Sequence, residues 1–258
     1  MSEPPKRRML RPPSGGAGGG RALVERLKSG KDRTASSRAW LERQIADPFA
    51  AEARARGYRS RAAFKLAEID ARFHLLRPGA RVIDLGCAPG GWLQVARERA
   101  VGALVGVDVL AIDPMDGATV FQDDFTEDGV GERLIAALGG APDIILSDMA
   151  PNTTGHRRTD HLRIIALVEA AAEFAAQSLR PGGALLAKAF QGGETAAVVG
   201  RMKAVFTQVR HLKPKASRAE SSELYLLATG FRGSNGELRA DARKRASNRG
   251  HQVLGSSR

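Results

Sequence analysis

The sequence predicts an α/β fold with a mainly parallel sheet and helices on both of its faces. Short apolar segments alternate with longer segments in which apolar residues recur at helical spacing. A glycine-rich turn also follows the first apolar strand and opens a helix, as in a βαβ unit. The 258 residues, 43% hydrophobic and 26% charged, suffice for one sizeable domain with tails. This composition excludes a collagen repeat, a disulfide scaffold and a wholly disordered chain.

The first predicted helix covers residues 58–73, because its apolar residues recur at i, i+4, i+7 and i+11. They are Ala62, Leu66, Ile69 and Phe73. Strands are predicted where short apolar runs lie between turn signals, at residues 81–85, 103–108, 119–122, 144–147, 184–189, 205–212 and 223–229. Helices are predicted between them, at residues 91–100, 127–138, 160–179 and 194–206, and the third of these ends at a Pro-Gly-Gly terminator. In such sheets ligands bind at the carboxyl ends of the strands.

The positive charge lies at the two ends of the chain. Residues 1–63 carry 15 basic and 6 acidic residues, and residues 231–258 carry 7 and 2, whereas residues 64–230 carry 18 and 20. We interpret residues 1–35 as a disordered basic arm, residues 36–230 as the folded domain and residues 231–258 as a basic, flexible tail. Basic ends on a near-neutral domain favour a nucleic acid partner, with a solubilising tail as the alternative.

The remaining composition favours a cytoplasmic protein. The single cysteine, Cys87, cannot form an internal disulfide and suits a reducing compartment. No apolar run approaches the roughly 18–20 residues that span a bilayer, and the N-terminus has no apolar signal region, so we expect no membrane partner. The five histidines show no metal-like spacing, and we expect no metal. Sequence does not determine the oligomeric state, although we favour a monomer.

The first strand is followed by a glycine turn, Asp84-Leu-Gly-Cys-Ala-Pro-Gly-Gly-Trp92. Its glycines let the backbone approach a ligand closely, but their spacing is not the G-x-G-x-x-G of dinucleotide sites. An acidic residue before the glycines suits an amino-acid cation better than a pyrophosphate. The alternative interpretation is a purely structural strand-to-helix turn.

Carboxylates follow the next two strands. Asp108 ends the second strand, where a carboxylate can accept hydrogen bonds from both hydroxyls of a ribose. Asp123 and Asp124 follow the third strand, within reach of an adenine amino group. Together these residues describe an adenosine pocket without a phosphate requirement, so S-adenosylmethionine (SAM) fits better than NAD.

The fourth strand ends at Ser147-Asp-Met-Ala-Pro-Asn152. This segment lacks the Asn/Asp-Pro-Pro-aromatic loop with which amino-group methylases hold an exocyclic amine. Cys87 has no second cysteine near it, which argues against cysteine-based C5 methylation.

The chain resembles the FtsJ/RrmJ family of SAM-dependent ribose 2′-O-methyltransferases. The resemblance covers about residues 60–230, in five stretches that occur in the family's order. They are Arg59-Ser-Arg-Ala-Ala-Phe-Lys65-Leu, the glycine turn 84–92, the segment 147–152, Ala187-Lys188-Ala-Phe-Gln-Gly192 and Ser217-Arg-Ala-Glu-Ser-Ser-Glu223-Leu-Tyr. The long basic N-terminal arm and the basic C-terminal extension depart from the compact bacterial members, and leave the docking of RNA less well defined.

The resemblance implies a Rossmann-like methyltransferase fold with a seven-stranded sheet. It further implies methylation of a uridine 2′-OH in 23S rRNA, on the assembled 50S subunit. It places a catalytic tetrad on Lys65, Asp148, Lys188 and Glu223, and SAM contacts on Gly90, Trp92, Asp108, Asp124 and Asp148. Alternatives are another RNA substrate (tRNA or an mRNA cap), a non-catalytic RNA-binding ribosome-assembly factor, and an NAD-dependent oxidoreductase.

A ribose 2′-OH is a poor nucleophile, so a positioned base near it is useful. We expect Lys188 to be that base, although a free lysine is almost fully protonated at neutral pH. A second cation, Lys65, and partial burial would favour a neutral amine. We expect Asp148 to orient Lys188 and contact the cofactor, and Glu223 to position Lys65 or the ribose. Lys188 either removes the proton or only orients the hydroxyl. The alternative for each residue alone is a structural role, such as a solvated lysine at a strand end or a glutamate that caps a sheet edge.

Overall fold

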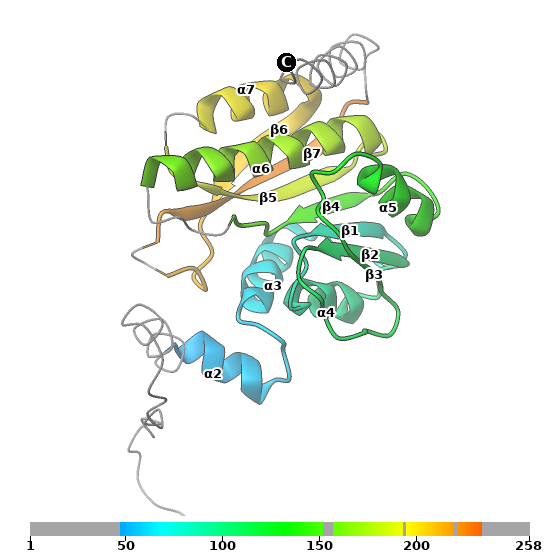
Figure 1. Cartoon of the computed structure of the whole chain (residues 1–258), viewed down its shortest axis with the longest axis vertical. Coiled ribbons are helices and arrows are strands. Elements are labelled where there is room, and N and C mark those ends of the chain that lie inside the picture. Colours follow the sequence, from blue (N-terminus) through cyan, green and yellow to red (C-terminus); the bar gives the residue numbers. More distant parts are fainter. Residues whose placement is uncertain (1–46, 152–156, 193–194, 219–220, 234–258) are drawn as a thin grey trace, which may run out of the picture. The chain divides into compact units, whose positions relative to one another are not determined.

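Seven strands form a single sheet in the order β3-β2-β1-β4-β5-β7-β6 (Figure 1). The computed structural model describes residues 47–151, 157–192, 195–218 and 221–233. The strands are β1 (Arg81–Leu85), β2 (Ala103–Asp108), β3 (Thr119–Gln122), β4 (Ile144–Ser147), β5 (Ala184–Phe190), β6 (Phe206–Leu212) and β7 (Glu223–Phe231). The helices are α2 (Pro48–Ala55), α3 (Ala62–Phe73), α4 (Gly91–Glu98), α5 (Val130–Leu138), α6 (Arg157–Ser178) and α7 (Thr195–Val205).

Strands β1 to β5 pair in parallel, whereas β7 lies between β5 and β6 and is antiparallel to both. In the β5–β7 register, Lys188 lies opposite Tyr225 and Phe190 lies opposite Glu223. Because β7 runs in the opposite direction, its first residues lie at the edge where β1, β4 and β5 end. This edge is where the sequence predicts the ligand.

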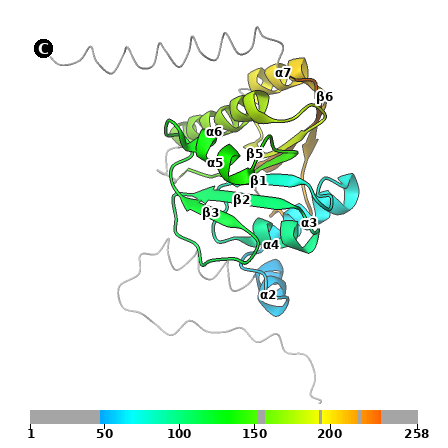
Figure 2. The ribbon, with the colours of Figure 1, turned by 90° about the vertical axis from the view of Figure 1, so that its right-hand side faces the viewer.

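Helices cover both faces of the sheet, as predicted. Figures 1 and 2 show α5, α6 and α7 on one face and α3 and α4 on the other. Each face has its own hydrophobic core: Leu134, Val168 and Met202 lie in the first, and Leu66 and Leu93 lie in the second. Burial of these two layers is the main force that holds the helices to the sheet.

The structure differs from the prediction mainly at helix ends. The helix predicted from residue 58 begins at Ala62, and the one predicted from residue 127 begins at Val130, after Gly129 with φ 81°. Helix α6 begins at Arg157, three residues before the predicted start. Helix α2 was not predicted, because its eight residues are too few for a clear apolar period.

The predicted basic arm, residues 1–35, lies outside the described residues, as does most of the predicted tail. The last strand runs to Phe231, one residue into the segment that the sequence assigns to the tail. The predicted domain boundaries therefore stay predictions.

Candidate active site

Four of the predicted site residues meet at the carboxyl edge of the sheet. Lys65 comes from α3, Asp148 from the segment after β4, Lys188 from β5 and Glu223 from the start of β7. They form two ion pairs, Lys65 with Glu223 and Lys188 with Asp148. Residues more than 150 positions apart in the chain are thus brought together by the sheet.

The Lys65–Glu223 pair is buried. Lys65 Nζ lies 2.6 Å from Glu223 Oε1, and the two side chains are only 10% and 13% exposed. Ser217 Oγ donates a second hydrogen bond of 2.9 Å to the same oxygen. Burial alone would raise the pKa of Glu223, but the Lys65 ammonium outweighs it and holds that pKa below its usual value. Glu223 is therefore a carboxylate that positions Lys65.

The Lys188–Asp148 pair is held more loosely. Lys188 Nζ lies 3.2 Å from Asp148 Oδ1 and donates a hydrogen bond of 3.1 Å to the main-chain oxygen of Asp148. The two side chains are 11% and 17% exposed. Two acceptors on one residue fix where the amine sits, while an ammonium still has a third donor position. The arrangement can hold a hydroxyl at Nζ.

Tyr225, to which the sequence motifs assigned no role, links the two ion pairs. Its hydroxyl donates a hydrogen bond of 2.7 Å to Asp148 Oδ1 and accepts one of 3.3 Å from Lys65 Nζ. Burial, followed by the charges of Asp148 and Glu223, raises the pKa of Tyr225 well above its usual value, so it stays a neutral phenol. Strand periodicity was the available signal, since Glu223 and Tyr225 are two residues apart on one strand and share a face.

The glycine turn lies beside this network. Gly86 has φ 77°, and a Cβ there would lie 2.8 Å from the main chain of Met149, so only glycine fits. Gly90 has φ 107° at the N-cap of α4, and a Cβ there would lie 3.0 Å from the Arg59 guanidinium. The turn is thus held against both the β4 end and the segment before α3.

Asp84 is the most unusual group in this region. It is fully buried, and neither carboxylate oxygen has a hydrogen-bond partner among the described residues. Burial, together with the charges of Asp148 and Asp108, raises its pKa well above the usual value. A buried carboxyl group without partners costs free energy that a bound cation would recover. The surroundings of Asp84 are therefore consistent with the expectation from sequence that this residue binds an amino-acid cation.

The other predicted cofactor residues surround the turn in different ways. Asp108 accepts hydrogen bonds of 2.9 Å from the main-chain N–H groups of Ala88 and Leu110, one on each oxygen. Each oxygen keeps a further lone pair for a ligand. Asp124 accepts from the hydroxyl and the N–H of Thr126, and these bonds lower its pKa. Both bonds are made to Oδ1 of its side chain.

Trp92 departs most from its expected role. Its indole Nε1 donates to the main-chain oxygen of Ala62 at 2.8 Å, and its ring packs 5.7 Å from that of Tyr225. The side chain is 3% exposed and joins α4 to α3 and β7. Its main-chain N–H, in the first turn of α4, is the group left to contact a ligand.

Two apolar residues that sequence reasoning missed follow Asp108. Val109 and Leu110 are 58% and 64% exposed, although large apolar side chains are usually buried. They lie where a purine ring would be expected if Asp108 held its ribose. Their position directly after Asp108, at the end of a strand, was the signal from which they could have been found.

Within residues 47–151, 157–192, 195–218 and 221–233, no group of three or more histidine, cysteine, aspartate or glutamate side chains is arranged to hold a metal ion. No helix in this part of the chain is long and apolar enough to cross a membrane.

Replacing Asp84 with asparagine is expected to stabilise the cofactor-free protein by about 1–3 kcal/mol at pH 8, because it removes a buried carboxyl group that ionises without a partner. The raised pKa means that the folded state binds this proton more tightly than the unfolded chain. The wild type therefore loses stability as pH rises above the ordinary aspartate pKa of 3.8 toward the raised pKa. The gain on substitution should grow with pH.

Thermal unfolding of both proteins between pH 5 and pH 8 measures this difference. A gain that does not change with pH would show that the Asp84 carboxyl has an ordinary pKa. An equivalent substitution at exposed Asp116 should have no effect at any pH.

Comparison with known proteins points to one family. Residues 58–231 match the family described as FtsJ-like methyltransferase. The chain is 61% identical, over 87% of its length and 100% of the relative's, to ribosomal RNA large subunit methyltransferase E of Caulobacter vibrioides. It is 55% identical to the protein of the same name from Paramagnetospirillum magneticum, over 86% and 94% of the two chains.

A solved structure agrees with these relatives. The crystal structure of a protein described as a ribosomal RNA methyltransferase from Plasmodium falciparum superimposes with a TM-score of 0.62 at 32% identity. It covers 69% of this chain and 100% of that one. The family match, residues 58–231, includes every element from α3 to β7 that positions the two ion pairs.

Proposed function

Because the chain belongs to the FtsJ-like methyltransferase family, we propose that it transfers the methyl group of SAM to the 2′-OH of a uridine in 23S rRNA, on the assembled 50S subunit in the cytoplasm. The observation that carries the proposal is the pair of lysine–carboxylate ion pairs joined by Tyr225 at the carboxyl edge of the sheet. The names of the relatives support the choice of large-subunit rRNA.

The cofactor would lie along the glycine turn. Asp84 would take the ammonium of its amino-acid part, since this buried carboxyl group has no other partner among the described residues. Asp108 would accept from the ribose hydroxyls with the lone pairs that the Ala88 and Leu110 amides leave open. Val109 and Leu110 would cover the adenine with exposed apolar surface. Gly90, Asp124, Asp148 and the main chain of Trp92 complete the proposed site.

The protein's residues then act on the acceptor hydroxyl. SAM supplies an already activated methyl group, so the protein must align the acceptor oxygen and take up its proton. Lys188, as the neutral amine, would hold that hydroxyl at Nζ and receive its proton, because Asp148 fixes the amine from two sides. Lys65 lies at the other end of the Tyr225 hydroxyl.

The test uses 50S subunits from a strain that lacks this enzyme, with labelled SAM and mapping of the methylated ribose. Label at one uridine of 23S rRNA in assembled subunits supports the proposal. Label in naked 23S rRNA but not in subunits would contradict the assembled substrate. Label confined to tRNA or capped mRNA would contradict the substrate class, and label in no RNA would favour a non-catalytic assembly factor.

The Asp108→Ala variant is expected to bind SAM at least tenfold more weakly, because hydrogen bonds to a charged group contribute about 1.5–3 kcal/mol. It also releases the Ala88 amide, so the glycine turn loses one of its anchors. Calorimetry with SAM measures the dissociation constant, with Asp116→Ala as the control for loss of a carboxylate in an adjacent loop. An unchanged constant would remove Asp108 from the cofactor site.

A further inference from the structure

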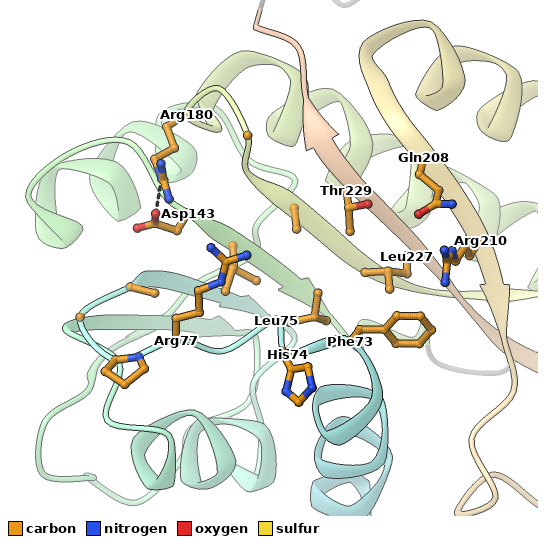
Figure 3. Close-up of a pocket in the computed structure, with 16 residues that line it drawn as sticks. Phe73, His74, Leu75, Arg77, Asp143, Arg180, Gln208, Arg210, Leu227 and Thr229 are labelled. Carbon is orange, nitrogen blue, oxygen red and sulfur yellow. Dashed lines mark hydrogen bonds and ion pairs between the residues drawn. The ribbon is translucent and has the colours of Figure 1, made fainter.

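A cavity of about 450 Å³ lies at the opposite end of the sheet from the ion pairs (Figure 3). Its walls include the starts of β4 and β5, the end of β7, edge strand β6 and the segment after α3. Ala184 in this cavity and Lys188 in the active site are four residues apart on β5, about 13 Å at the usual strand rise. The cavity is therefore separate from the cofactor site.

Most of the surface that lines this cavity is polar, a few buried apolar residues lie at its base, and arginines surround it. Leu75, Ile144 and Leu227, exposed by 7%, 4% and 1%, are among the residues at the base. Three arginines lie around it: Arg77, Arg180 and Arg210. Asp143 is the one carboxylate among the residues that line the cavity.

That carboxylate is already neutralised. Arg180 Nε donates to Asp143 Oδ1, and the main-chain N–H of Arg81 donates to Oδ2 at 2.8 Å. Arg77 has no ion pair within the described part of the chain, and Arg210 has none either. The Arg210 guanidinium lies 5.4 Å from the centre of the Phe73 ring. Two positive charges at the rim are thus uncompensated.

Polar groups that can read a base lie on the β6–β7 side. Figure 3 shows Arg77 projecting over the middle of the cavity, with Gln208, Thr229 and Arg210 along the opposite wall. The volume of the cavity falls in the usual range for a ligand pocket, about 300–1,000 Å³. Guanidinium groups suit phosphate, since their fork of donors matches its oxygens.

We propose that this cavity binds one unpaired nucleotide of an RNA strand, with the base in the cavity and backbone phosphates of the strand at Arg77 and at Arg210. Gln208 and Thr229 would meet polar atoms of the base. The choice of an RNA strand over a free nucleotide rests on the proposed function, whereas the nucleotide chemistry rests on the cavity alone. The protein would then hold its substrate at two points, at opposite ends of one sheet.

The test compares the wild type with the Arg77→Ala/Arg210→Ala variant. A labelled short oligouridylate is the strand probe, read by fluorescence anisotropy over a salt series, and uridine 5′-monophosphate is the free-nucleotide probe. The control is Lys203→Ala, which removes an exposed positive charge from α7 on the other face of the sheet. Neither arginine makes an ion pair with the described residues, so each variant should stay folded. Unfolding temperature and SAM affinity are measured for every variant to check this.

The double variant is expected to bind oligouridylate about tenfold more weakly for each arginine lost. The slope of log affinity against log salt should fall by about 0.7 for each phosphate contact removed. Lys203→Ala should leave both quantities unchanged, and the monophosphate should bind far more weakly than the strand.

Three results would overturn the proposal. Unchanged binding of both probes by the double variant would exclude a nucleotide site, and an equal loss in Lys203→Ala would show only general charge attraction. Tight binding of the monophosphate that excludes the strand would identify a free-nucleotide site. Methyl transfer to 50S subunits is assayed separately. If the wild type bound oligouridylate through these arginines but did not methylate rRNA, the proposed function would be wrong and the nucleotide site would still be supported.

Discussion

The Lys188→Ala variant is expected to lose about 10²–10⁴-fold in the rate of methyl transfer, the usual contribution of a positioned base. SAM affinity should stay near wild type, whereas stability should fall, because Asp148 keeps its hydrogen bond from Tyr225 but loses its ion pair. Single-turnover methylation of unmethylated 50S subunits measures the rate, and calorimetry measures SAM binding.

Lys188→Arg should not restore the rate. A guanidinium stays protonated at any working pH, and its planar fork cannot occupy the position that Asp148 gives the amine. Lys203→Ala, at an exposed position of α7, is the matched control and should keep the full rate. A Lys188→Ala protein that retained more than about a tenth of the wild-type rate would show that positioning alone carries catalysis.

The Lys65→Met variant is expected to be about 3–5 kcal/mol less stable at pH 7, because it leaves Glu223 buried and charged without its partner. For a domain of this size each kcal/mol lowers Tm by roughly 2–4 °C. Methionine keeps most of the volume of the lysine stem, so the loss of stability measures the effect of removing the positive charge. Arg56→Met breaks an exposed pair with Glu52 and should change stability by well under 1 kcal/mol.

The loss of stability in Lys65→Met should depend on pH. In the wild type the pKa of Glu223 is lowered, so its pair with Lys65 stabilises the fold above the ordinary glutamate pKa of 4.5, and this stabilisation is lost as pH falls through the lowered pKa. In Lys65→Met burial would dominate and raise that pKa, so the stability deficit should shrink as pH falls from 7 toward 4.5.

A second variant separates stability from catalysis. Lys65→Met/Glu223→Gln removes the stranded charge and should recover most of the lost Tm, yet methyl transfer should stay slow. A double variant that regained both would show that the pair has only a structural role.

Most of the fold could be predicted, because its signals are local. Each strand was predicted from a short apolar run between turn residues, and the observed ends agree within two residues. Helix α2 gave too weak a pattern over its eight residues to be recognised. The order of β7 and β6 at the sheet edge depends on pairing between distant segments, which periodicity does not report.

The residues of the site could be predicted from local motifs, but the contacts between them could not. Lys65, Asp148, Lys188 and Glu223 were named from motifs, and the structure brings all four together. Their pairing could not be derived, since Lys65 faces Glu223 only through the antiparallel course of β7. Tyr225 and the buried packing of Trp92 were missed for the same reason, because both depend on contacts between segments far apart in the chain. The individual roles of these residues stay predictions.

The alignment of β5 with β7 has a consequence for how the gene can change. Lys188 lies opposite Tyr225, and alternate residues of a strand face opposite sides of a sheet. A single-codon insertion or deletion between Tyr225 and Thr229 would turn Glu223 and Tyr225 toward the α6 side and separate both from Lys188. Homologous genes should therefore keep a fixed count of codons between Glu223 and Thr229.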